Sequence, residues 1–143
     1  MLHYLDYRET HDADAWWTAE ATADDRRRVV TTIEETLRRF GAVRTRRWGE
    51  VVSIEMREGD VRTFSFQIAE RSALLEPTVL APSGDVLLDS LADIIASKMV
   101  ALVERGAPRD FRDIHAVCQA GLVTPPECWA LWTRRQTAAG SDV

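Results

Sequence analysis

The sequence predicts an α+β fold, in which helices pack on a small mixed β-sheet. Short segments with apolar residues at every second position fill most of the first half, whereas the second half repeats its apolar residues at helical spacing. A length of 143 residues suits one domain. We therefore expect a single domain over residues 1–143, with a sheet-bearing part at about 1–80, a helical part at about 86–136 and a soft tail at 137–143.

Composition and charge narrow the class of protein. Hydrophobic residues make up 45% and charged residues 29% of the chain, as in ordinary soluble globular proteins. A net charge of −5 argues against a protein that coats nucleic acid non-specifically, since that affinity depends on neutralising phosphates. No apolar run approaches the roughly 20 residues of a membrane span, so we expect a cytoplasmic protein without a membrane partner. Cys118 and Cys128 fit reduced core thiols better than a disulfide or a zinc site.

Two aspartates near the start of the chain raise the first question of function. The residues of "THDADAWW" alternate, so on a strand Asp12, Asp14 and Trp16 share one face. Same-face positions lie about 7 Å apart, and two carboxylates there repel by roughly 2 kcal/mol at an effective dielectric constant of about 20. A divalent cation removes that repulsion, and Mg2+ commonly takes one or two carboxylates together with substrate phosphates. The motif alone fits either a magnesium half-site or a solvated strand end.

An amphipathic helix is predicted over residues 22–40. Thr22 suits its N-cap, Asp24 and Asp25 favour its first turn, and Gly41 suits its end. The apolar positions of this helix are Val29, Val30, Ile33, Leu37 and Phe40.

Three strand segments follow this helix. They are "AVRTRRW", "VVSIEMR" and "VRTFSFQIAE", separated by turns at Gly49 and at "EGD". We expect an antiparallel meander beside the aspartate strand, with Phe64, Phe66 and Ile68 facing inward. Pro77 and Pro82 interrupt this pattern, and the rest of the chain is predicted to be helical.

The helix predicted for residues 90–106 carries Lys98, the only lysine among 18 lysine and arginine residues. Ser90 suits its N-cap and Gly106 its end. The apolar face comprises Leu91, Ile94, Ile95, Met99 and Leu102. At about 100° per residue, Lys98 falls inside this face. Because an unpaired buried ammonium is costly, Lys98 must snorkel, meet a carboxylate or line a cavity that binds an anionic ligand.

The segment "APRDFRDIHAVCQAG" predicts the next helix and supplies a candidate partner for Lys98. Its apolar arc comprises Phe111, Ile114, Val117 and Cys118. Asp110 falls within this arc and Asp113 at its edge. The short connection "ERGAP" favours antiparallel neighbours, which would bring Lys98 and Asp110 onto one internal surface. The alternative is a structural Asp110 that bridges to Lys98 or to nearby arginines. A last helix is predicted in "TPPECWALW", capped by Thr124.

Three stretches carry a family resemblance: "YRETHDADAWW", "FSFQIAERSALLEP" and "LLDSLADIIASKMVALVERGAPRDFRDIHAVC". Together they resemble the AbiEii-type nucleotidyltransferase family, which includes toxins of type IV toxin–antitoxin systems. The last stretch is the most specific, because a helix lysine followed by R-G-x-P-R-D-F-x-D-I is similar to the signature of that family. The resemblance covers nearly the whole chain and implies a polymerase-β-like nucleotidyltransferase fold.

The resemblance also implies roles for individual residues. Asp12 and Asp14 resemble the D-x-D pair that binds Mg2+ or Mn2+. Lys98 resembles the lysine that contacts nucleotide phosphates, and Asp110 resembles the aspartate of the R-D-F motif. The resemblance thus implies a catalytic site made of the aspartate pair, Lys98 and Asp110. The implied partners are a nucleoside triphosphate, an acceptor that can be tRNA, and a cognate antitoxin. Positioning and electrostatic stabilisation carry most of such a phosphoryl transfer.

Two departures from the family pattern keep several hypotheses open. The family usually begins its site with a Gly-Gly-Ser or Gly-Gly-Thr turn, whereas "MLHYLDYRET" resembles only the remaining part of the helix after that turn. Either the start codon is assigned too far downstream or the protein has lost the turn. Ser65 and Gln67 stand where many such folds place a third carboxylate, and neither replaces an anionic ligand.

Three hypotheses follow from these patterns. The first is a nucleotidyltransferase that transfers a nucleotide from a metal-bound triphosphate. The second is a catalytically inactive member that keeps the fold as a binding or regulatory module. The third is an unrelated structural domain with a buried Lys98–Asp110 pair.

Overall fold

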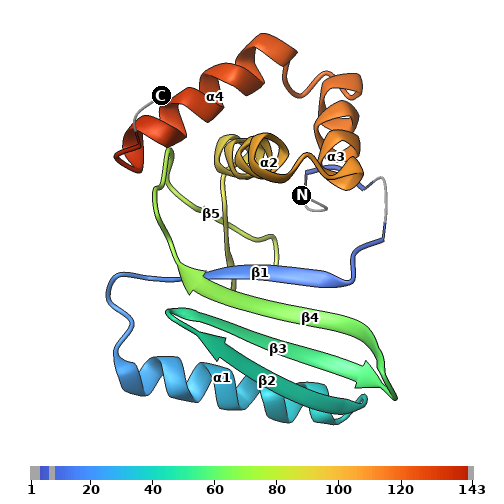
Figure 1. The fold of residues 1–143 in the computed structure, drawn as a ribbon. Coiled ribbons are helices and arrows are strands. Elements are labelled where there is room, and N and C mark those ends of the chain that lie inside the picture. The colour runs from blue at the N-terminus through green and yellow to red at the C-terminus, as the bar shows by residue number, and fades with distance from the viewer. Residues whose placement is uncertain (1–3, 7–8, 142–143) are drawn as a thin grey trace. The chain divides into compact units, whose positions relative to one another are not determined.

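The computed structural model describes residues 4–6 and 9–141, which contain four helices and six strands (Figure 1). The elements are β1 (Asp12–Trp17), α1 (Ala23–Arg38), β2 (Ala42–Trp48), β3 (Val51–Glu58), β4 (Val61–Glu70), β5 (Val79–Leu80), β6 (Leu87–Leu88), α2 (Leu91–Arg105), α3 (Pro108–Gln119) and α4 (Pro125–Ala138). This content confirms the predicted α+β class. The chain divides into a sheet unit, Glu9–Arg71, and a helical unit, Met1–Arg8 with Ser72–Val143.

The sheet unit is built on a four-stranded mixed sheet in the order β1-β4-β3-β2. Strands β2, β3 and β4 form the predicted antiparallel meander, and β1 joins β4 in parallel. Gly49 and Gly59 supply positive φ angles, 53° and 57°, in the turns before β3 and β4. The sheet is therefore mixed, because β1 and β4 are parallel whereas the other neighbouring strands are antiparallel.

Helix α1 covers one face of this sheet and forms the core of the unit (Figure 1). Val30 of α1 packs with Val52, Ile54 and Ile68, all of which are buried. The Thr22 N-cap is confirmed, with Asp25 completing a reciprocal capping box.

The predicted end of α1 and part of its apolar face are wrong. The helix ends at Arg38, so Phe40 lies beyond it and is 73% exposed. Val29 is also exposed, because the stripe at positions 30, 33 and 37 alone faces the sheet.

The helical unit has a second core, formed by α2, α3 and α4. Its buried residues are Ile95, Met99, Val117, Val123 and Cys128. Ser90 is the N-cap and Gly106 the C-cap of α2, as predicted, and Gly106 has a φ of 58°. Figure 1 shows α2 nearly end-on and α3 from the side, so the two helices cross and the predicted antiparallel arrangement is wrong.

Helix α3 buries most of the predicted arc, and only the prediction for Phe111 is wrong. Ile114 and Cys118 pack on the core around Val117. Asp110, Asp113 and Val117 are its buried residues, whereas Phe111 is 61% exposed. Asp110 lies within the arc, as predicted, and Asp113 at its edge is also buried, so the buried side of α3 extends toward Asp113 and away from Phe111. The burial of two aspartates requires cationic partners.

The last helix and the two cysteines complete the helical unit. Helix α4 begins at the predicted Thr124 capping box with Glu127, and it continues to Ala138, past the predicted end at 136. Cys118 and Cys128 are free, as predicted, with their sulfur atoms 4.0 Å apart. Burial raises the pKa of the Cys128 thiol to about 12, and the neighbouring Cys118 adds to this effect.

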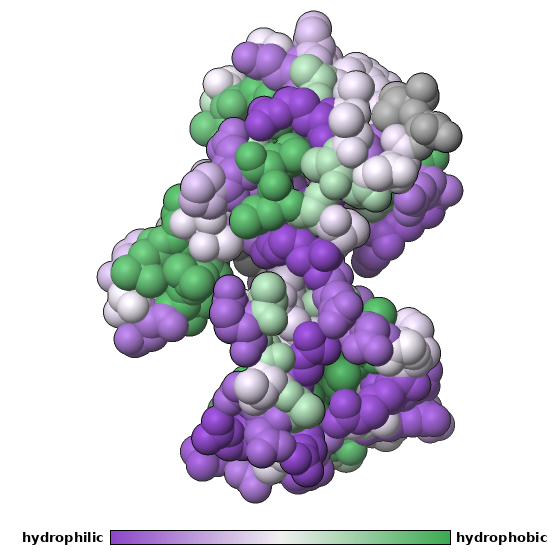
Figure 2. Space-filling model, turned by 90° about the vertical axis from the view of Figure 1, so that its left-hand side faces the viewer, coloured by the Kyte–Doolittle hydropathy of each residue, from purple (hydrophilic) through white to green (hydrophobic). Residues whose placement is uncertain are grey.

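Residues 79–88 form a small hairpin, β5–β6, where only helix was expected beyond the prolines. The turn of this hairpin contains Gly84, with a φ of 80°, and closes through a 2.8 Å hydrogen bond from the Ala81 amide to the Val86 carbonyl. Hydrophobic side chains reach the surface in several groups (Figure 2). The exposed ones of this segment are Val79, Leu80, Val86 and Leu87. Within the part of the chain that the structure describes, no helix has both the length and the hydropathy to cross a membrane.

The start of the chain differs from the expected helix remnant. Residues 4–6 and 9–10 are not helical, and the other residues of "MLHYLDYRET" lie outside the described ones. Instead, the Tyr4 hydroxyl donates a 2.8 Å hydrogen bond to the Asp89 carbonyl, and Leu5 packs on the core of the helical unit.

Candidate functional site

The aspartate pair lies on β1, at one edge of the sheet. Asp12 pairs in parallel register with Ser65 of β4, and Asp14 with Gln67. Paired positions point to the same side of a sheet, and Ala15 and Ile68 take the core side, so these four residues share the face opposite α1. The Thr10 hydroxyl donates a 2.8 Å hydrogen bond to Asp12 Oδ1, which orients that carboxylate.

These residues fit one half of a divalent cation site. Across the described residues, no group of three or more His, Cys, Asp or Glu side chains could hold a metal ion. Two carboxylates on one strand face nevertheless suit Mg2+ or Mn2+, which complete their coordination with water and substrate phosphate oxygens. Asp12 and Asp14 are thus the residues that would hold the ion, and a bound cation would supply positive charge to the phosphates.

A third carboxylate, which was not predicted from the sequence, shares this face. Glu55 of β3 lies opposite Ser65, and its side chain is 9% exposed. A guanidinium nitrogen of Arg57 lies 3.3 Å from Glu55 Oε2, and one of Arg46 lies 3.8 Å away. The signal was present in the alternation of β3, because inward Val52 and Ile54 oblige Glu55 to face the aspartates' side. The two arginines already balance its charge.

Lys98 of α2 meets a carboxylate, but not the one expected from the sequence. Its Nζ lies 2.8 Å from Oδ2 of Asp113, which is fully buried, whereas the Lys98 side chain is 25% exposed. The expectation of Asp110 as the ion-pair partner is therefore corrected. Arg105, at the end of α2, reaches Asp110 in the first turn of α3. Lys98 lies seven residues earlier, about 10 Å along α2, and pairs with Asp113, one turn further along α3.

Asp110 instead pairs with Arg105, the last residue of α2. The Arg105 Nε and a terminal nitrogen donate hydrogen bonds of 2.8 and 2.9 Å to the two oxygens of Asp110. These bonds hold the pKa of the Asp110 carboxyl below its usual value, against the opposing effect of burial. The charge of nearby Lys98 lowers this pKa further, so Lys98, Asp110 and Asp113 form one charged cluster of the helical unit.

A further buried acid, Asp93, has a structural environment. The backbone amides of Leu75 and Glu76 and the Ser90 hydroxyl donate hydrogen bonds of 2.8 to 3.0 Å to its carboxylate. Arg135 of α4 lies 3.5 Å away. Asp93 therefore joins the segment before β5, the start of α2 and the last helix.

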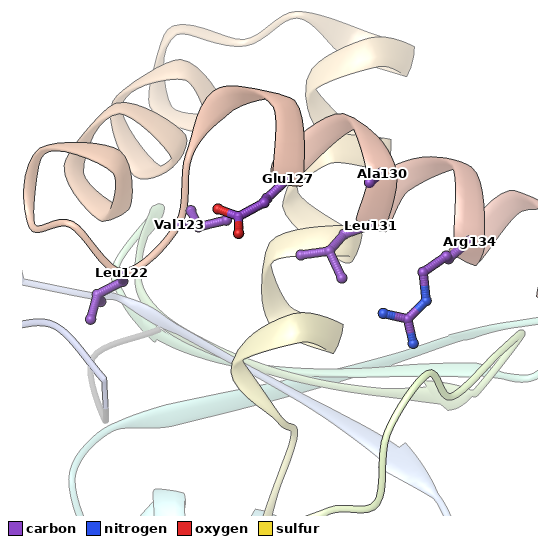
Figure 3. A pocket seen from close by; sticks show the side chains of 6 residues that line it. All are labelled: Leu122, Val123, Glu127, Ala130, Leu131 and Arg134. Carbon is purple, nitrogen blue, oxygen red and sulfur yellow. The ribbon is translucent and has the colours of Figure 1, made fainter.

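Two hollows of the helical unit contain none of the charged cluster. One, of about 290 Å³, lies along α4 and the turn before it, with Glu127 and Arg134 among its lining side chains (Figure 3). Glu127 already caps α4, and Arg134 lies 3.9 Å from Glu76. The other hollow is lined mainly by apolar side chains, including Met99, Phe111 and Trp129. Neither set of lining residues resembles a phosphate-transfer site.

The predicted site residues fall into two groups. Asp12 and Asp14 belong to the sheet unit, and Lys98 and Asp110 to the helical unit. The structure adds Asp113, which pairs with Lys98, to the group of the helical unit. It adds Glu55, opposite Ser65, to the group of the sheet unit.

The comparison with protein families adds an independent finding. The family model described as nucleotidyl transferase AbiEii toxin, type IV TA system, matches residues 1–139. The match includes both the aspartate strand and the stretch from Lys98 to Asp113. No curated protein and no solved structure matches the chain.

Proposed function

Because this chain belongs to the AbiEii nucleotidyltransferase toxin family of type IV toxin–antitoxin systems, we propose that it transfers a nucleotide from a metal-bound nucleoside triphosphate to an acceptor hydroxyl. We take tRNA as the acceptor, Mg2+ or Mn2+ as the metal, and the cytoplasm as the compartment. Membership makes the protein a nucleotidyltransferase-like toxin and implies a cognate antitoxin. The hypothesis of an unrelated structural domain is wrong.

The observation that carries the proposal is the shared face of Asp12 and Asp14 on β1, beside Ser65 and Gln67. In the proposed reaction the acceptor oxygen forms a bond to the α-phosphorus. The bond between the α-phosphorus and the oxygen that bridges the α- and β-phosphates breaks. Pyrophosphate leaves, and the hydroxyl proton passes to solvent. Lys98 binds the phosphates, and the two aspartates would hold the metal ion, which would supply positive charge to the phosphate oxygens.

Binding tests the metal half-site directly. With Mg2+ and a nucleoside triphosphate we expect a rise in melting temperature that Asp12→Asn with Asp14→Asn abolishes, because neutral amides then replace the two carboxylates that would hold the ion. EDTA should remove the rise from the unaltered protein. Asp60→Asn, at an exposed turn of the same unit, is the matched control and should keep it. An unchanged rise in the double variant would refute the assignment.

The inactive-module hypothesis remains the second candidate, because Ser65 and Gln67 are neutral and two arginines balance Glu55. Transfer of labelled nucleotide to total tRNA separates the two. An enzyme incorporates label, and loss of both aspartates lowers the rate at least about 100-fold, as expected when several kcal/mol of electrostatic stabilisation disappear. A binding module shows the melting shift without incorporation.

A further inference from the structure

The charged cluster of the helical unit assigns its two α3 aspartates to different cations. Asp113 Oδ2 lies 2.8 Å from Lys98 Nζ, and Asp110 accepts two hydrogen bonds from Arg105. Both carboxylates are fully buried. Arg105 is the last residue of α2, so the Asp110 pair fastens the two ends of the short connection between α2 and α3. The Asp113 pair acts two turns earlier on α2.

The ion pair explains how Lys98 keeps one orientation within an apolar helix face. A lysine side chain has several rotatable bonds, and an unpaired ammonium there would snorkel toward water. A buried carboxylate holds the ammonium by a charge-assisted hydrogen bond. An ammonium has three N–H donors, so a pair with Asp113 leaves donors for a second anion on the side where Lys98 is 25% exposed.

We propose that Asp113 is the positioning residue for Lys98, holding its ammonium for a nucleotide phosphate, whereas Asp110 anchors the α2–α3 connection through Arg105. The assignment of phosphate binding to Lys98 rests on the proposed function. The pairing itself does not, so the two are tested separately.

The first test uses the single lysine as a spectroscopic probe. Lysine labelled with 15N at Nζ gives one side-chain ammonium signal from this sequence. We expect the signal in the unaltered protein and in Asp110→Asn, because the buried carboxylate of Asp113 slows proton exchange. Asp113→Asn should remove it. Its survival in Asp113→Asn, its loss in both variants, or its absence from the unaltered protein would overturn the pairing proposal.

The second test asks whether Asp113 acts through Lys98 on nucleotide binding. We expect Asp113→Asn and Lys98→Met each to raise the nucleoside triphosphate Kd about tenfold, and the double variant to bind no more weakly than either. The double variant removes both charges of the pair, so it leaves no unpaired charge and shows whether a single change acts only by destabilising the fold. Asp113→Glu should recover part of the affinity, and Glu104→Gln, at an exposed position of α2, should change Kd by less than about twofold.

The outcomes separate the two proposals. Multiplying, independent effects of Asp113→Asn and Lys98→Met would contradict the positioning role, and so would an effect of Glu104→Gln as large as that of Asp113→Asn. If the unaltered protein fails to bind triphosphate, the proposed function fails, and the ammonium signal still decides whether Asp113 holds Lys98.

Discussion

Three aspartates of the helical unit, Asp93, Asp110 and Asp113, are fully buried, and each has a cation beside it. A buried charge without a partner is strongly destabilising, whereas a well-bonded pair is close to neutral in stability. The pairs therefore specify which helix positions meet rather than adding net stability. Asp93 differs from the other two because backbone amides also donate to it.

Removal of Asp93 should be the most destabilising of the single carboxylate changes. Asp93→Ala leaves Arg135 and the Leu75 and Glu76 amides without their acceptor, and we expect a loss of about 3 kcal/mol or more in the free energy of unfolding. Urea denaturation followed by circular dichroism measures this loss. Asp85→Asn, at an exposed turn residue, should stay within about 0.5 kcal/mol of the unaltered protein. Equal effects of the two changes would contradict a structural role for Asp93.

At the scale of elements, local side-chain hydrogen bonds set the start of α1. The Asp25 amide donates to the Thr22 hydroxyl, and the Thr22 hydroxyl and amide donate back to the Asp25 carboxylate. The hydrogen bond from the Thr22 hydroxyl is the main cause that lowers the pKa of Asp25 to about 2, with Arg28 and the Thr22 amide contributing. The two residues of this capping box are only three positions apart in sequence, so the start of α1 was predictable.

Loss of the cap should weaken α1. Thr22→Ala removes the side-chain acceptor, and we expect a cost of about 1 kcal/mol in the free energy of unfolding. The folded pKa of Asp25 lies below its unfolded value, so the contribution of the box is present above about pH 4 and fades as the pH falls toward 2. Denaturation at pH 7 and pH 2.5 should therefore show a smaller difference between variant and unaltered protein at the lower pH. Thr31→Ala, in the exposed middle of α1, is the control and should lack this pH dependence.

At the scale of the whole molecule, the chain has two hydrophobic cores, one in each unit. Ile54 lies in the core of the sheet unit and Met99 in that of the helical unit, and both are almost completely buried. Each core unites residues distant in sequence, and the helical unit also includes Tyr4 and Leu5 from before β1. The two units therefore have separate sources of stability.

Cavities in the two cores should loosen different parts of the chain. Ile54→Ala and Met99→Ala each leave a cavity, at a cost of about 2–5 kcal/mol. Hydrogen exchange should accelerate first in β1–β4 for Ile54→Ala and in α2–α4 for Met99→Ala. The two variants serve as controls for one another. Identical exchange patterns over the whole chain would contradict separate cores.

Most elements could be predicted because their signals are local. The ends of β2, β3 and β4 follow from alternation and turn glycines, and α2 follows from Ser90 and Gly106. The β5–β6 hairpin could not, since each strand has only two residues and no alternation is visible in so short a run. Phe111 was misplaced because hydropathy cannot foresee that paired aspartates occupy the buried stripe of α3.

The sequence by itself determined the α+β class, the family, the shared strand of Asp12 and Asp14, and the position of Lys98 within an apolar helix face. Each of these depends on periodicity or on an ordered motif, which the backbone converts directly into geometry. Only the tertiary structure decided that Lys98 meets Asp113, that Arg105 pairs with Asp110, and that Arg46 and Arg57 lie beside Glu55. Periodicity determines which face of its own helix or strand a side chain occupies. Its partner depends on how the two elements pack and on which positions along them come into contact.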